Sequence, residues 1–136
     1  MTGVQTCALP IFEEEGLEAA WARHRQNHLA LAAGLGALDI DFLVDGAHRL
    51  PQLNCVRFPA SIDDGAVRHQ LLEQYQLEIG AGLGPLAGKV WRIGLMGYAS
   101  SRKNVVLCLG ALEAVLREQG ARLEPGQAVA AAQAVY

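Results

Sequence analysis

The sequence of 136 residues lacks an apolar run long enough to cross a membrane. A spanning helix needs about 20 mainly apolar residues, so we expect no membrane partner. The sequence also lacks a basic excess, because 14 acidic residues stand against 11 Lys and Arg and the net charge is −3. Nothing forms a basic stripe, and the sequence therefore predicts no nucleic-acid partner.

Cysteine is scarce, and the three cysteines, Cys7, Cys55 and Cys108, show no metal-binding spacing. The simplest prediction is that Cys55 and Cys108 are buried thiols in a reducing cytoplasm, and we expect a cytoplasmic protein. His24 and His28 lie one helical turn apart and could ligate a metal. Because no third ligand is apparent, we favour a role in helix packing and expect no metal site.

What the chain does contain is the composition of a packed domain, with 51% hydrophobic and 18% charged residues. Residues 1–11, Met-Thr-Gly-Val-Gln-Thr-Cys-Ala-Leu-Pro-Ile, do not fit such a domain. They resemble the translation of a common sequencing adapter, so we expect residues 1–12 to be an artefact and the natural protein to continue upstream. The remaining residues, about 125, are enough for one domain with a core.

The spacing of apolar residues predicts helices alternating with short strands. Recurrence at every third or fourth position indicates a helix, and strict alternation indicates a strand. Gly34 and Gly36 are expected to fray the end of the first helix. Residues 123–136 predict an Ala-rich tail helix that adds little apolar bulk and is partly detached. The other expected helices span about 13–38, 61–75 and 100–119, and the expected strands about 42–44, 52–58, 77–79 and 90–96.

This order of elements, with hairpin-like connections, predicts an α+β fold in which a small, mostly antiparallel sheet carries helices on one face. Within the last strand, side chains alternate between the two faces of the sheet. Trp91, Ile93 and Leu95 form a set suited to the core, so the helices should cover that face. Arg92 should then point out of the open face.

A glycine-rich loop precedes the strand that carries Arg92. Gly80, Gly82 and Gly84 are expected to shape this loop beside a site, or to serve only as turn formers. The loop is not a phosphate-binding loop by motif, because Val90 stands where such a loop needs Ser or Thr. No dinucleotide-binding glycine pattern fits either.

Arg92 itself is a candidate anion site. Its guanidinium is planar and always charged, and it suits a carboxylate or a phosphate. Gly94, its neighbour on the same face, leaves room for a ligand to approach. The alternative is an arginine held in a local ion pair on a half-exposed strand, and the sequence leaves both interpretations open.

A family resemblance enters with these residues. The segments Ile79-Gly80-Ala81-Gly82-Leu83-Gly84-Pro85 and Gly88-Lys89-Val90-Trp91-Arg92-Ile93-Gly94-Leu95-Met96-Gly97 closely resemble the C-terminal domain of alanine–glyoxylate and serine–pyruvate aminotransferases. These enzymes belong to the class V, pyridoxal-phosphate-dependent group. Glu15-Gly16-Leu17-Glu18, Arg49-Leu50-Pro51 and Arg102-Lys103-Asn104 agree in order and spacing. The resemblance covers roughly residues 13 to 120.

The resemblance implies that residues 13–122 are the C-terminal small domain of a fold type I transferase and that Arg92 binds the α-carboxylate of the substrate. It implies transamination from alanine or serine to glyoxylate or another 2-oxo acid, with pyridoxal phosphate as cofactor, in a homodimer. Neither Lys89 nor Lys103 occupies the family's lysine motif. That motif and the cofactor contacts belong to an N-terminal domain absent from this sequence, so we expect no catalytic or cofactor-binding residue here and no activity of the chain alone.

Two alternatives stay open. One is a sibling class V enzyme, a serine–glyoxylate or ureidoglycine–glyoxylate aminotransferase. The other is a free-standing α+β ligand-binding module, because a fold does not determine a function.

Overall fold

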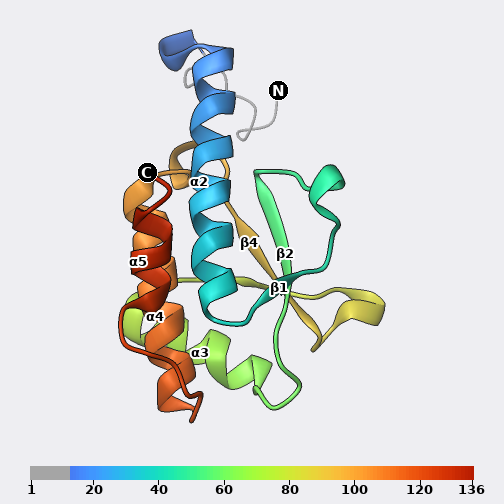
Figure 1. The fold of residues 1–136 in the computed structure, drawn as a ribbon. Coiled ribbons are helices and arrows are strands. Elements are labelled where there is room, and N and C mark those ends of the chain that lie inside the picture. The colour runs from blue at the N-terminus through green and yellow to red at the C-terminus, as the bar shows by residue number, and fades with distance from the viewer. Residues whose placement is uncertain (1–12) are drawn as a thin grey trace.

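A computed structural model describes residues 13–136 of the chain, so the artefact predicted for residues 1–12 lies outside the described residues. The described part is built around a four-stranded antiparallel sheet with the strand order β1-β2-β4-β3 (Figure 1). The strands are β1 (Asp41–Phe42), β2 (Leu53–Arg57), β3 (Gly80–Ala81) and β4 (Val90–Gly94).

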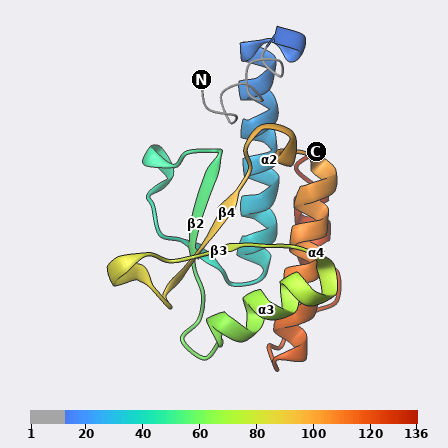
Figure 2. The same cartoon turned by 180° about the vertical axis from the view of Figure 1, so that it is seen from behind.

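The helices lie on one side of this sheet, as the sequence predicted, and the view from behind shows the opposite side of the sheet uncovered by helices (Figure 2). No helix in the described part of the chain is both long and apolar enough to span a bilayer. The antiparallel sheet with helices on one side confirms the α+β prediction. The helices are α2 (Leu17–Ala37), α3 (Asp64–Tyr75), α4 (Arg102–Glu118) and α5 (Gln127–Gln133), and short 3₁₀ turns occur at Gly46–His48, Gly84–Leu86 and Gly97–Ala99.

Side-chain caps set where two of the helices begin. The Asp63 carboxylate accepts a hydrogen bond from the backbone N–H of Ala66 at 2.9 Å. Asp63 is therefore the N-cap, and α3 starts at Asp64. The Ser101 hydroxyl accepts from the N–H of Asn104 at 3.2 Å and caps α4.

The third strand is displaced from its predicted place. The sequence indicated residues 77–79, whereas the pairing with β4 runs through Gly80 and Ala81. Ile79 is buried in the core with 5% exposure. The apolar side chain of Ile79 therefore packs into the core. The prediction took apolar residues as the sign of the strand, whereas the residues that pair with β4 are Gly80 and Ala81.

The core lies between the helices and the face of β4 that carries Trp91. Trp91 has no exposed surface, and Ile93 and Leu95 are each 4% exposed. Phe58 stacks on the Trp91 ring with the centroids 4.5 Å apart. The alternation along β4 thus confirms the predicted assignment of its two faces.

Trp91 also anchors α3 through Asp64. The indole N–H donates to Asp64 Oδ1 at 2.8 Å, and Arg68 Nε donates to the same oxygen at 2.8 Å. The hydrogen bond from Arg68, joined by that from Trp91, holds the pKa of Asp64 below its ordinary value although partial burial opposes this.

The lowered pKa of Asp64 predicts a pH-dependent stability. Because the folded-state pKa is below the unfolded value, the contribution is present above the unfolded pKa and is lost as the pH falls through the folded pKa. Asp64→Asn should lower the free energy of unfolding at pH 7 by about 1.5 kcal/mol and flatten its decline below about pH 4. Urea unfolding across that range measures both effects. Glu73→Gln, at an exposed site of the same helix, is the control, and equal acid sensitivity of Asp64→Asn and the unmodified chain would contradict the prediction.

The tail helix is docked, which corrects the prediction that it is partly detached. Ala128 and Ala132 of α5 are fully buried. The buried carboxylate of Glu113 in α4 accepts hydrogen bonds from the backbone N–H groups of Gly126 and Ala128 at the start of α5. Gln127 donates to the carbonyl of Ala37 at 2.6 Å. The small alanines let α5 approach closely, and Glu113 satisfies N–H groups that a helix start leaves open.

Gly34 is a packing contact rather than a point of fraying. A Cβ at this position would lie 2.3 Å from Leu109 Cδ1 and 2.9 Å from the carbonyl oxygen of Ala128. The helix continues to Ala37, so the predicted fraying is wrong. Gly34 lets α2 meet α4 and α5 where a side chain would not fit.

Candidate functional site

Arg92 lies half-buried on the open face of the sheet, at the centre of three strands. Its register partners are Cys55 of β2 on one side and Gly80 of β3 on the other. The Nε–H donates to the backbone carbonyl of Ala81 at 2.8 Å. This bond fixes the plane of the guanidinium across β3.

The terminal nitrogens of Arg92, Nη1 and Nη2, have no carboxylate partner within residues 13–136, because the ion pairs found there join other residues. The local ion pair that the sequence left open is therefore not formed in the described part of the chain. With Nε engaged by a carbonyl, the two terminal nitrogens form the remaining donor edge of the guanidinium. Such an edge can bind a carboxylate through two parallel hydrogen bonds.

The three loop glycines act in different ways. A Cβ on Gly80 would lie 3.3 Å from Arg92 Nη2, so glycine leaves room for the arginine to cross β3. A Cβ on Gly82 would lie 2.0 Å from the carbonyl oxygen of Leu86, which makes a side chain there incompatible with the turn. Gly84 has φ +53°, which favours glycine. The structure thus explains why each of these three positions beside Arg92 requires or favours glycine.

The two described cysteines differ, which corrects half of the prediction that both are buried. Cys108 is buried, and burial raises the pKa of its thiol to about 12. Cys55 is only half-buried, because it lies on the open face beside Arg92. Desolvation raises the pKa of Cys55, while the positive charges of Arg92 and Arg57 act in the opposite direction.

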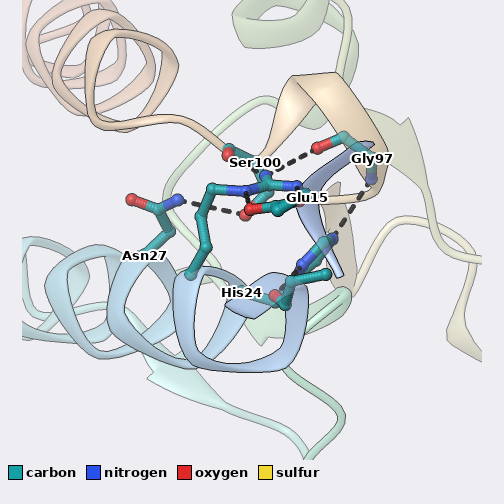
Figure 3. A network of polar contacts seen from close by, with 7 residues as sticks. Glu15, His24, Asn27, Gly97 and Ser100 are labelled. Carbon is teal, nitrogen blue, oxygen red and sulfur yellow. Dashed lines mark hydrogen bonds and ion pairs between the residues drawn. The ribbon is translucent and has the colours of Figure 1, made fainter. Parts of the chain in front are cut away.

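A polar network holds the loop that follows β4 (Figure 3). Arg23 of α2 forms a paired contact with Glu15, with Nε and Nη2 at 2.6 and 2.7 Å from the two carboxylate oxygens. Its Nη1 donates to the carbonyls of Gly97 and Ser100. Asn27 donates to the Ser100 hydroxyl at 3.1 Å. The network ties the C-terminal end of the Arg92 strand to α2.

The two histidines belong to separate hydrogen-bond chains. His24 Nε2 accepts from the N–H of Gly97 at 3.2 Å, and its Nδ1 lies 2.6 Å from the carbonyl of Ala20. His28 Nδ1 lies 2.6 Å from Asn54 Oδ1, and the Asn54 amide donates to the carbonyl of Ile93 at 3.2 Å. These contacts support the packing role. Within residues 13–136 no group of three His, Cys, Asp or Glu side chains could hold a metal ion.

Sequence reasoning did not predict the contacts of Arg23, Glu15 and Asn54. Arg23 and Glu15 are eight residues apart, and the backbone break at Gly16, with φ 84°, brings them together. Neither the helical spacing rules nor a motif would have paired them. Asn54 could have been noticed in the sequence, because it is a polar residue at a core-facing position of a strand.

No protein-family model matches the chain. The (S)-ureidoglycine–glyoxylate transaminase of Bacillus subtilis is 46% identical over 123 residues, which are 90% of this chain and 30% of that protein. The alanine–glyoxylate aminotransferase of Callithrix jacchus is 41% identical over 110 residues, which are 80% of this chain and 27% of that protein. The chain thus spans about 30% of the length of the curated relatives it matches.

Solved structures agree with these relatives. The ureidoglycine–glyoxylate aminotransferase of Bacillus subtilis superposes with a TM-score of 0.87 at 46% identity, covering 90% of this chain and 32% of that one. The pyridoxamine–pyruvate aminotransferase of Mesorhizobium loti gives a TM-score of 0.87 at 31% identity, covering 93% and 33%. The chain is homologous to a C-terminal portion of such aminotransferases and has the fold of that portion.

Proposed function

We propose that this chain is the substrate-binding C-terminal portion of a class V, pyridoxal-phosphate-dependent aminotransferase, which moves an amino group from alanine or serine to glyoxylate or another 2-oxo acid. The observation that carries the proposal is the open donor edge of Arg92. Every amino acid and 2-oxo acid substrate brings a carboxylate, and Arg92 offers a charged fork with no carboxylate partner among residues 13–136.

In this proposal Arg92 binds and orients the substrate. The bond from its Nε to the carbonyl of Ala81 holds the guanidinium in one plane before the substrate arrives. A carboxylate bound through two parallel hydrogen bonds has little freedom to rotate, so the rest of the substrate is presented in one direction. Gly80 and Gly82 support this geometry by leaving the space that the arginine and the turn require.

Within residues 13–136 neither lysine lies in a site that could hold the cofactor. Pyridoxal phosphate supplies the carbanion chemistry of aminotransferases and needs a lysine to hold it. Both lysines of the chain, Lys89 and Lys103, are exposed, and Lys103 stands in the first turn of α4. The cofactor contacts therefore belong, in our proposal, to the part of the relatives that this chain does not match.

The chain by itself should form no specific adduct with the cofactor. Purified chain mixed with pyridoxal phosphate and reduced with borohydride should show only scattered, substoichiometric labelling, because no lysine lies in an enclosed site. Mass spectrometry of tryptic peptides measures the labelling, and the Bacillus subtilis relative serves as the positive control. Stoichiometric labelling of either lysine would contradict the proposal.

A chimera tests the function directly. Residues 13–136 would replace the corresponding portion of the Bacillus subtilis relative, and the product is called the chimera below. Transamination of glyoxylate by alanine or serine supports the proposal, and a chimera that folds and binds cofactor but transfers no amino group from any donor refutes it. The 46% identity with the ureidoglycine relative favours ureidoglycine as the donor of a second candidate function, so this donor belongs in the same assay.

The alternative of a free-standing module is less well supported. Leu53 and Met96 lie by the open face near Gly94 and are 42% and 59% exposed. Apolar surface beside a candidate site is typical of a face that another domain covers. We propose that the remainder of a homodimeric cytoplasmic enzyme covers it. A chain that stays monodisperse at high concentration in sedimentation would favour the module instead.

A further inference from the structure

A hollow that Arg92 does not line lies at the end of the sheet where β2 ends and β4 begins. It is a groove with a cavity volume of about 450 Å³, within the usual range for small-molecule sites. Its apolar walls come from three segments that are distant in sequence: Leu43 after β1, Phe58 and Ile62 after β2, and Leu86 and Val90 around the glycine loop. We refer to it below as the Arg57 groove.

Two cations stand at this groove, and no acidic residue in the described part of the chain lines it. Arg57 and Lys89 are both exposed lining residues. Arg57 ends β2 and pairs with Val90, and Lys89 lies in the turn just before Val90, so both cations stand at the same end of the sheet. Asp41 is the cross-strand partner of Arg57, but within residues 13–136 neither cation comes within ion-pair distance of a carboxylate.

The chemistry of these walls selects one class of ligand. An apolar floor favours a hydrocarbon or an aromatic ring, and burying it there releases water from both surfaces. A guanidinium and an ammonium at the rim favour an anion, and the Arg57 fork suits a planar carboxylate. Inorganic phosphate would satisfy the cations and leave the apolar walls uncovered. An alcohol of the same shape would do the reverse.

We propose that the Arg57 groove binds small amphipathic carboxylates, with the carboxylate on Arg57 and Lys89 and the apolar part against Phe58, Ile62 and Leu86. This second anion site is distinct from Arg92 and does not depend on aminotransferase activity. The residues concerned come from the end of β2, the segment that follows it and the loop before β4, so the site exists only in the folded chain.

Titration of the whole chain with 4-phenylbutyrate tests the proposal. The affinity of a ligand of this size should be weak, with Kd of about 1 mM. Amide resonances of residues 57–62 and 86–90 should shift in ¹H–¹⁵N spectra. The double substitution Arg57→Gln with Lys89→Gln should weaken binding about tenfold or more, because it removes both charged hydrogen-bond donors. Circular dichroism verifies that this exposed double variant remains folded.

Three controls decide the interpretation. Arg92→Gln should leave the Kd for 4-phenylbutyrate unchanged, which separates this site from the proposed substrate site. The uncharged 4-phenylbutan-1-ol and inorganic phosphate should each bind about tenfold more weakly than the acid. Shifts centred on Arg92, equal binding of the alcohol, or a double variant within about twofold of the unmodified chain would each overturn the proposal.

Discussion

The chimera carrying Arg92→Lys should lose at least about 30-fold in kcat/KM for its amino donor, which corresponds to about 2 kcal/mol. Lysine keeps the positive charge and loses the fork. The three N–H donors of its ammonium diverge from one nitrogen, so they cannot form two parallel hydrogen bonds to a carboxylate while a third holds the Ala81 carbonyl in the same plane. The substrate would still be attracted, but it would no longer be held in one orientation.

Steady-state kinetics of the chimera measure this loss with alanine, serine and ureidoglycine as donors. Arg122→Lys is the matched control, because Arg122 is exposed and follows α4. It should keep the activity of the unmodified chimera. If Arg92→Lys also keeps its full kcat/KM, Arg92 does not bind the substrate carboxylate, and the proposed function loses its support within this chain.

Gly34→Ala should lower the free energy of unfolding of the chain by about 2 kcal/mol. The added methyl group meets Leu109 Cδ1 at 2.3 Å, and the backbone oxygen of Ala128 at 2.9 Å. Leu109 can rotate away, but Ala128 is backbone, so α5 itself must shift. That shift also strains the hydrogen bonds that Glu113 accepts from the start of α5. The loss exceeds the gain in helix propensity, which favours alanine by about 1 kcal/mol.

Gly36→Ala in the same helix is the control for that experiment. Nothing lies within 4 Å of a Cβ placed on Gly36, so only the propensity term acts. The free energy of unfolding should rise by about 0.5–1 kcal/mol. Urea unfolding of the three chains compares the two substitutions. Changes of the same sign at Gly34 and Gly36 would show that α5 does not dock on Gly34.

The features that could be predicted from the sequence are those that depend on neighbouring residues. The period of two in a strand placed Trp91 and Arg92 on opposite faces before any coordinates were known. The helix predicted for residues 61–75 is found at Asp64–Tyr75, because a helix start depends on a capping side chain and the residues that follow it. The loop glycines were recognised as loop formers, although the close contact of Gly82 with the Leu86 carbonyl that explains one of them could not be predicted.

The predictions that failed involve partners distant in sequence. The docking of α5 requires Glu113 and Gly34, and neither residue carries a local sign of that role. Cys55 is half-buried because the open face has no helix over it, whereas Cys108 faces the core. The Arg57 groove joins three segments that lie apart in sequence.

By itself the sequence determined the alternation of strands and helices, the side of the sheet on which Arg92 lies, and the kinship with aminotransferases. The tertiary structure alone decided that Arg92 keeps an open donor edge within the described residues, that the tail helix is packed, and where Arg57 and Lys89 meet an apolar groove. The physical reason is the range of the interactions. Periodicity, capping and turn formation act over a few residues, whereas burial and the pairing of charges depend on which distant segments the fold brings into contact.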